Sequence, residues 1–168
     1  MNNAQERLVQ WMRDAHAMEK QAERIMETEA NRIENYPELK AQLERHLEET
    51  RHQAERLRRR LEQLDGGPST TKDTMAKMMG FAQGMSGLFA GDEVLKGSLA
   101  NYTFEHMEIA SYKMLIAAAN EAGEHEVRRR LEENLREEEA MAQWLGQHLP
   151  EVTRQYLHRE AAGQASKV

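Results

Sequence analysis

Residues 38–64, ELKAQLERHLEETRHQAERLRRRLEQL, hold apolar or small residues at a strict seven-residue interval: Leu43, Thr50, Leu57 and Leu64. Four more apolar residues widen this line into a stripe: Leu39, Leu47, Ala54 and Leu61. Charged residues fill most of the other positions. Such a stripe on a charged segment is typical of a helix that packs against other helices, so this segment predicts one helix of a bundle.

The rest of the chain shows similar patterns between a few breaks. Apolar residues at spacings of three, four and seven predict three more long helices: 4–34, 93–122 and 124–149. A short C-terminal helix, 151–159, is expected after Pro150, because proline interrupts helices. Residues 66–91 combine glycines with methionines at helical spacing. They predict a long crossover that contains a short helix.

The composition agrees with an all-α fold. Aromatic residues make up 5% of the 168 residues and there are 3 prolines, which is unusual for a sheet protein. Two helical hairpins joined by one long connection form a four-helix bundle with a crossover. We therefore expect one bundle domain over residues 1–160. The small and polar residues 161–168 are expected to form a flexible tail.

Charge and hydropathy exclude several classes of function. The 23 Lys and Arg residues are outnumbered by 29 Asp and Glu, a net charge of −6 that argues against nucleic-acid binding. No apolar run approaches the roughly 18 residues of a membrane span. The polar first residues lack a secretory signal, so we expect a cytoplasmic protein. With no cysteine, only carboxylates and the 7 histidines are available to hold a metal.

Two glutamates fall where the helical core is expected. Glu138 lies seven residues after Leu131 and seven before Leu145, in the middle of the apolar stripe of its helix. Glu19 projects ~40° from Ala15 on the inward face of the first helix. A buried carboxylate without a partner costs several kcal/mol or takes up a proton. We therefore expect either a raised pKa at Glu138 or a cation beside it.

Four further residues are candidates for the same region. At least one of Glu105 and Glu108 is expected to enter the core, and His46 and Glu49 lie on one side of the second helix. Inward carboxylates from four helices, together with a histidine, form an oxygen-rich site of the kind that accepts iron or manganese. The alternative is that arginines or lysines of neighbouring helices neutralise these carboxylates without a metal.

The string Glu49–His52 spells E-x-x-H, the ligand pair of di-iron bundles. However, His52 projects ~160° from the apolar line, whereas His46 projects only ~40° from it. We therefore expect His46, and not His52, to lie near the site. The fourth helix has no equivalent histidine, since Ala140 and Met141 stand three residues after Glu137 and Glu138.

Several strings resemble the YciE/YciF family of bacterial stress-associated proteins, the YciE branch in particular: DAHAMEKQ at 14–21, NYPEL at 35–39, HLEET at 46–50, DEVLKGS at 92–98, EHMEIASY at 105–112 and EEE at 137–139. The resemblance implies a ferritin-like bundle similar to rubrerythrin-type di-iron proteins. It also implies stress-linked expression and a homodimer in which the short additional helix lies at the interface. The Met-rich crossover is the segment expected to supply that helix.

The resemblance also implies a set of metal ligands. The first group is Glu19, Glu49, Glu108 and Glu138, and the second group is His46, Glu105 and Glu137. Together they predict a dinuclear iron or manganese site that acts on peroxide or oxygen. The alternative function is that of a metal-free structural or interaction dimer that keeps the bundle without catalysis.

Overall fold

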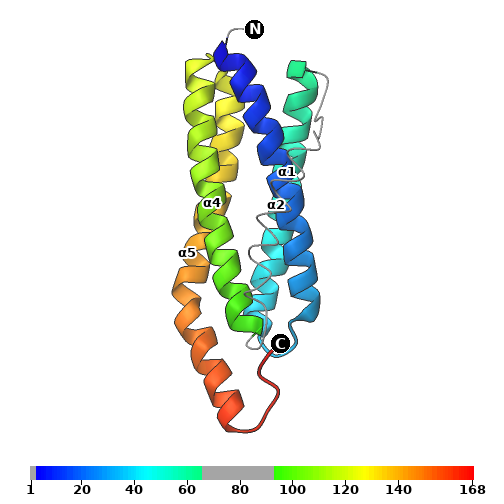
Figure 1. Cartoon of the computed structure of the whole chain (residues 1–168), viewed down its shortest axis with the longest axis vertical. Coiled ribbons are helices and arrows are strands. Elements are labelled where there is room, and N and C mark those ends of the chain that lie inside the picture. Colours follow the sequence, from blue (N-terminus) through cyan, green and yellow to red (C-terminus); the bar gives the residue numbers. More distant parts are fainter. Residues whose placement is uncertain (1–2, 66–92) are drawn as a thin grey trace.

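The computed structural model describes residues 3–65 and 93–168 of the chain. These residues form four long helices: α1 (Asn3–Arg32), α2 (Pro37–Asp65), α4 (Glu93–Glu121) and α5 (His125–Ala161). No strand occurs within these two ranges. The predicted all-α four-helix bundle is therefore confirmed (Figure 1). No helix in the described part is long and apolar enough to span a membrane.

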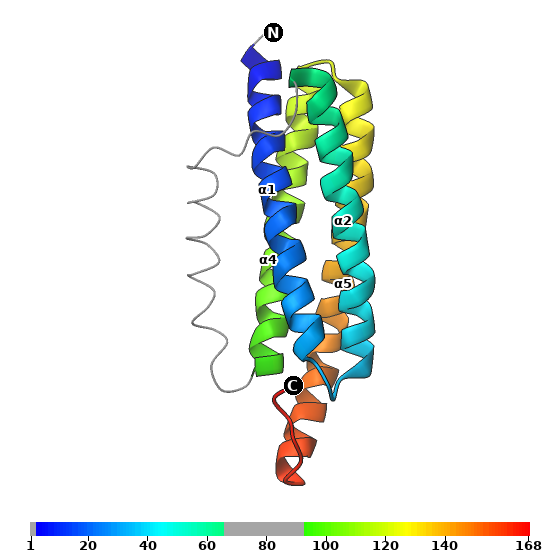
Figure 2. The same cartoon turned by 90° about the vertical axis from the view of Figure 1, so that its right-hand side faces the viewer.

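The helices pack in a ring in which α1 contacts α2 and α4, while α5 contacts α4 and α2. Helices α2 and α4 run in the same direction, so Asp65 and Glu93 lie at opposite ends of the bundle (Figures 1 and 2). Two parallel helices need a connection that runs the length of the bundle, as the sequence predicts. The short helix and methionines expected in that crossover lie outside the described residues.

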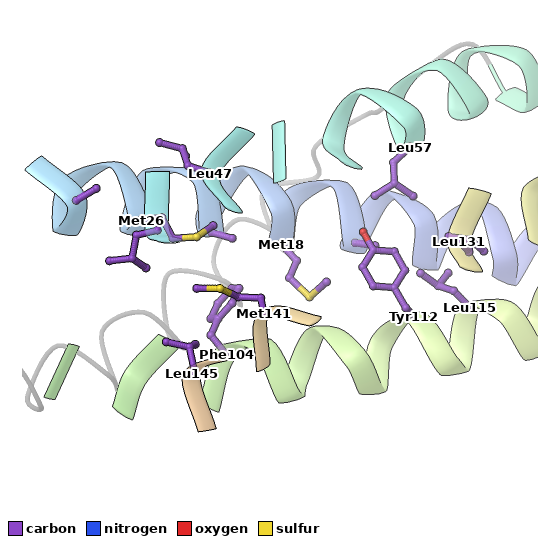
Figure 3. Close-up of a cluster of buried hydrophobic side chains, with 14 of the residues drawn as sticks. Met18, Met26, Leu47, Leu57, Phe104, Tyr112, Leu115, Leu131, Met141 and Leu145 are labelled. Atoms are coloured by element: carbon purple, nitrogen blue, oxygen red, sulfur yellow. The ribbon is translucent and has the colours of Figure 1, made fainter. Parts of the chain in front are cut away.

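The apolar stripes meet along the axis of the bundle. Leu43 and Leu61 of α2 are completely buried, and Leu131 and Leu145 of α5 are 1% exposed. Figure 3 shows part of this core, where side chains from different helices point toward one another. Burial of one such leucine stabilises the fold by about 1.5–3 kcal/mol. The stripes therefore fix how each helix is rotated, and with it the side chains that face inward.

The fourth helix does not end at Pro150, as the sequence predicted. Helix α5, which is 37 residues long, passes through Pro150 and ends at Ala161, so the expected separate helix 151–159 is its last part. Pro150 is exposed, and it lacks the N–H that would donate to the carbonyl of Gly146. Beyond it, Val152 and Tyr156 are buried against the core. Their burial holds the helix together where proline weakens it.

Residues 161–168, which we expected to form a flexible tail, turn back toward the bundle after Gly163 (Figure 1). The hydroxyl of Tyr36 donates to the Ser166 carbonyl, and the Val94 N–H donates to the Lys167 carbonyl over 2.9 Å. These bonds connect the tail to the α1–α2 turn and to the start of α4. The tail takes part in these bonds through backbone carbonyls. Every residue has such a carbonyl, so the amino-acid composition could not predict these contacts.

Candidate metal centre

One histidine and four carboxylates meet inside the bundle, and every helix supplies at least one of them. Each is at most 2% exposed: Glu19 from α1, His46 from α2, Glu105 and Glu108 from α4, and Glu138 from α5. Their inward positions agree with the helical geometry of the sequence. Both glutamates of α4 enter the core, where at least one was expected.

Three of these residues form a compact group. His46 Nε2 lies 3.2 Å from Glu105 Oε2 and 3.4 Å from Glu138 Oε2. One nitrogen or oxygen atom from each residue lies within 4.8 Å of the other two, a spacing that suits a shared metal ion. In the described structure none of these atoms has a hydrogen-bond partner. The facing atoms of the group are therefore buried without a hydrogen bond to the described protein.

Glu49 lies at the edge of this group and contacts the other side of the histidine ring. Its side chain is 38% exposed, and its Oε2 lies 2.8 Å from His46 Nδ1. In a neutral ring, Nδ1–H donates to Glu49 and the lone pair of Nε2 faces Glu105 and Glu138. A carboxylate that orients a histidine in this way is common around metal ligands. Glu49 therefore contacts the Nδ1 side of His46, whereas Glu105 and Glu138 face Nε2. The resemblance had placed Glu49 in the first group of ligands.

Glu19 and Glu108 lie beside the group of three. Glu19 Oε1 accepts a hydrogen bond from the Tyr112 hydroxyl, which in turn accepts one from Asn134 Nδ2 over 2.9 Å. Glu19 Oε2 and Glu108 Oε1 are buried and have no hydrogen-bond partner among the described residues. Neither Tyr112, which lies between Glu105 and Glu108 in helical projection, nor Asn134 was among the predicted site residues. Asn134 could have been found, because it lies three residues after Leu131 on the apolar stripe.

Glu137 is held by other partners. Its two oxygens accept hydrogen bonds from Arg56 over 2.7 Å and 2.8 Å, and Gln53 Nε2 donates to one of them over 2.9 Å. Gln53, which the sequence analysis also missed, is completely buried. Glu137 therefore closes the α2–α5 side of the site as an ion pair.

His52 lies on the surface, as its helical phase predicted. It is exposed and lines a groove between α2 and α5 together with Glu55 and Arg59. It therefore forms no ligand pair with Glu49, which contacts the ring of His46 instead.

Burial and mutual repulsion govern ionisation in the centre. Burial raises the pKa of Glu105 to about 8 and holds the pKa values of Glu19 and Glu108 well above their ordinary range. Burial alone would lower the pKa of His46, but the charge of Glu105 and the other adjacent carboxylates raises it well above 6.5. Without an ion, burial therefore favours the neutral forms of Glu19, Glu105 and Glu108, while the neighbouring carboxylates favour the charged form of His46.

Of the two expectations for Glu138, a raised pKa or a cation beside it, the structure shows the second. Burial alone would raise the pKa, but the adjacent His46 outweighs it, so the pKa of Glu138 is lowered. Glu138 and His46 thus form an ion pair, because the histidine is the cation that the sequence alone could not place.

The donor set fits a metal ion. One imidazole nitrogen and several carboxylate oxygens are common metal ligands in proteins. Glu19 Oε2, Glu108 Oε1 and both oxygens of Glu138 are buried and have no hydrogen-bond partner among the described residues, so a nearby cation would compensate their burial.

Several solved structures are similar to this chain. A protein from Xanthomonas campestris pv. campestris is 43% identical, with a TM-score of 0.81 over 95% of this chain and 99% of that one. YcfI from Rhodopseudomonas palustris, for which a structural role is suggested, is 27% identical, with a TM-score of 0.72 over 87% and 94%. The E. coli stress protein YciF is 25% identical, with a TM-score of 0.77 over 89% and 96%.

The similarity to YciF agrees with the family resemblance found in the sequence, and it extends over nearly all of both chains. A family model covers the same region, because residues 3–158 match the domain of unknown function DUF892. The chain belongs to the DUF892 family.

Proposed function

We propose that this chain is a ferritin-like protein that binds a dinuclear iron or manganese centre in its core. The observation that carries the proposal is the buried group of His46, Glu105 and Glu138, whose facing atoms lack hydrogen-bond partners in the described structure. A bundle core is where helical proteins of this kind build carboxylate metal sites.

The arrangement around Glu138 favours two ions. Glu138 interacts with His46 and Glu105 and also with Glu108 and Glu19. A carboxylate in this position can bridge two ions. Charge supports the same conclusion, since two divalent ions would balance the four ionised glutamates of the core while His46 is neutral.

The proposed activity is a reaction with peroxide or oxygen in the cytoplasm during stress. A bound pair of iron or manganese ions supplies redox chemistry at such a centre. The chain contributes the ligands, the orientation of His46 through Glu49, and a core that excludes water. The similar E. coli protein YciF is a stress protein, which supports this assignment.

Metal analysis tests the proposal directly. Protein purified without chelator and supplied with Fe²⁺ or Mn²⁺ should retain metal when measured by plasma mass spectrometry. Glu138→Ala should lose most of it, because it removes the central carboxylate. Glu139→Ala is the matched control, since Glu139 is exposed and pairs with Lys113. Wild-type protein that retains neither metal would contradict the proposal.

A second candidate is a metal-free structural or interaction protein. The observation that favours it is the ionisation of the centre, because a His46–Glu138 pair and three protonated glutamates together carry no net charge. The core can therefore fold without an ion, but the free energy of unfolding should decrease as the pH rises. This candidate predicts that no metal is retained and that Glu138→Ala changes only stability.

We further propose that the chain forms a homodimer through its Met-rich crossover, which lies outside the described residues. The described surface supports an apolar contact near α1 and α4, where a groove of about 240 Å³ is lined by Trp11 and Met114. These side chains are 38% and 58% exposed. The double change Met78→Glu, Met79→Glu should shift the protein toward monomer in sedimentation experiments. An unchanged dimer would exclude this segment.

A further inference from the structure

A chain of hydrogen bonds leads from the rim of the bundle to Glu19. Arg56 Nη1 donates to Asn134 Oδ1 over 2.8 Å, and Asn134 Nδ2 donates to the Tyr112 oxygen over 2.9 Å. The Tyr112 hydroxyl donates to Glu19 Oε1. The chain therefore begins at an arginine that is 27% exposed and ends at a carboxylate that is completely buried.

The direction of every bond in this chain is determined by chemistry. Arginine has no acceptor, so the carbonyl oxygen of Asn134 must face Arg56 and its amide nitrogen must face Tyr112. The oxygen of Tyr112 accepts from that nitrogen, so its only proton goes to Glu19. All donors thus point toward Glu19, and the charge of Arg56 polarises the chain in the same direction.

This arrangement leaves Glu19 with one available oxygen. Oε1 is engaged by Tyr112, whereas Oε2 is buried and has no hydrogen-bond partner in the described part of the chain. Glu19 also lies outside the compact group of His46, Glu105 and Glu138. The hydrogen bonds through Asn134 and Tyr112 therefore connect Arg56 to Glu19 and not to the compact group.

We propose that Tyr112 and Asn134 are positioning residues that hold Glu19 as a single-oxygen ligand of one of the two ions. The ion beside His46, Glu105 and Glu138 binds first and does not need them. The second ion, beside Glu19 and Glu108, binds more weakly and depends on them. This inference rests on the proposed function, and it adds the order in which the two positions fill.

The test is a titration with Mn²⁺ under anaerobic conditions, followed by calorimetry and by electron paramagnetic resonance. Wild-type protein should bind two ions in separate steps, the second step producing the signal of a coupled pair. In Tyr112→Phe the first step should be unchanged and the second weakened about 10- to 100-fold, with loss of the coupled signal. Tyr102→Phe, which removes a partly exposed hydroxyl from the same helix, should behave as wild type.

A double-mutant cycle separates positioning from a purely structural role. Glu19→Gln should weaken the second step, and adding Tyr112→Phe should weaken it no further, because Tyr112 acts through Glu19. A structural role would lower the unfolding midpoint without this dependence. If Tyr112→Phe does not fold, Asn134→Asp serves instead, since it replaces the donor to Tyr112 by an acceptor of the same size and should weaken the second step equally.

The outcomes distinguish a failure of the proposed function from a failure of this inference alone. If wild-type protein binds no Mn²⁺ and no Fe²⁺, the proposed function fails and this inference with it. If wild-type protein binds metal, three results overturn the inference alone: a single ion in the wild type, two unchanged steps in Tyr112→Phe, or effects of Tyr112→Phe and Glu19→Gln that add.

Discussion

His46 joins the exposed rim of the centre to its buried interior. Nδ1 contacts Glu49, which is partly exposed, while Nε2 faces the buried carboxylates of Glu105 and Glu138. Without an ion, the carboxylates keep the histidine protonated by raising its pKa. A metal ion needs the lone pair of Nε2, so its binding must release the proton from the ring.

Replacement of the two histidines of α2 tests this role. His46→Ala should sharply lower the iron or manganese content, because it removes the only nitrogen in the described group of three. His52→Ala should leave the content at the wild-type value, because His52 is exposed. Plasma mass spectrometry of both variants measures their metal content relative to the wild type. Metal loss in His52→Ala alone would show that the exposed histidine is the ligand.

Glu108 offers a test in which the sign of the effect is informative. Its pKa is raised by burial, so at neutral pH the unfolded state releases a proton that the metal-free native state keeps. Glu108→Gln imitates the protonated form and should raise the unfolding midpoint of metal-free protein at pH 7 to 8. With Mn²⁺ bound it should lower the midpoint, because it removes a ligand and the linked stabilisation.

The control for this prediction is Glu139→Gln on the exposed side of α5, which should change neither midpoint. A lower midpoint for metal-free Glu108→Gln would show that the carboxylate is ionised and has a partner in the native protein.

Single residues also show what a sequence can and cannot reveal. A rotation of ~100° per residue is enough to place Glu138 inside and His52 outside, because both positions depend on one helix only. The lowered pKa of Glu138 depends on His46 of another helix. The pairing of Glu137 with Arg56 likewise joins α5 to α2. To predict such contacts, one must know how both helices are rotated about their axes. The apolar stripes do not define these rotations closely enough.

At the scale of elements, α5 shows how tertiary packing overrides a local signal. The sequence predicted a helix end at Pro150, yet α5 passes through it. Buried Val152 and Tyr156 hold the last turns, and the tail beyond them bonds to the start of α4. Helix existence and phase were predictable from the stripes, whereas this boundary depended on contacts between distant segments.

The strain at Pro150 predicts a gain in stability on its removal. Pro150→Ala restores the N–H that can donate to the Gly146 carbonyl and removes the clash of the proline ring with that carbonyl. We expect the free energy of unfolding to rise by about 1–2 kcal/mol, as measured by urea denaturation. Pro37→Ala is the control and should give no gain, because proline suits the first residue of a helix such as α2.

At the scale of the whole molecule, the bundle stabilises a centre that is unfavourable by itself. Four helices bring Glu19, Glu105, Glu108 and Glu138 together at positions of at most 2% exposure. Most of these groups are neutral in the native state without an ion, whereas all of them ionise near pH 4.5 in the unfolded chain. The stability of the metal-free fold therefore decreases as the pH rises, whereas the stabilisation by a bound metal ion increases.

Metal-free protein should lose stability as the pH rises from about 5 to 8. Above the unfolded pKa of about 4.5, the native state binds more protons than the unfolded state, through Glu105 up to about pH 8 and also through Glu19 and Glu108, whose pKa values are raised by burial. His46 acts in the same direction above pH 6.5, since its native pKa is also raised. The slope of the unfolding free energy with pH is then negative.

Glu138 has the opposite sign, since its pKa is lowered, and it removes stability only as the pH falls below its unfolded value. Saturating Mn²⁺ should reverse the trend above pH 5, because ion binding requires ionised carboxylates and a neutral histidine, and so strengthens with pH. The measurement is the unfolding midpoint from pH 5 to 8, with and without Mn²⁺. Parallel curves would mean that the ion does not bind at these groups, whereas curves that diverge with pH would locate it among them.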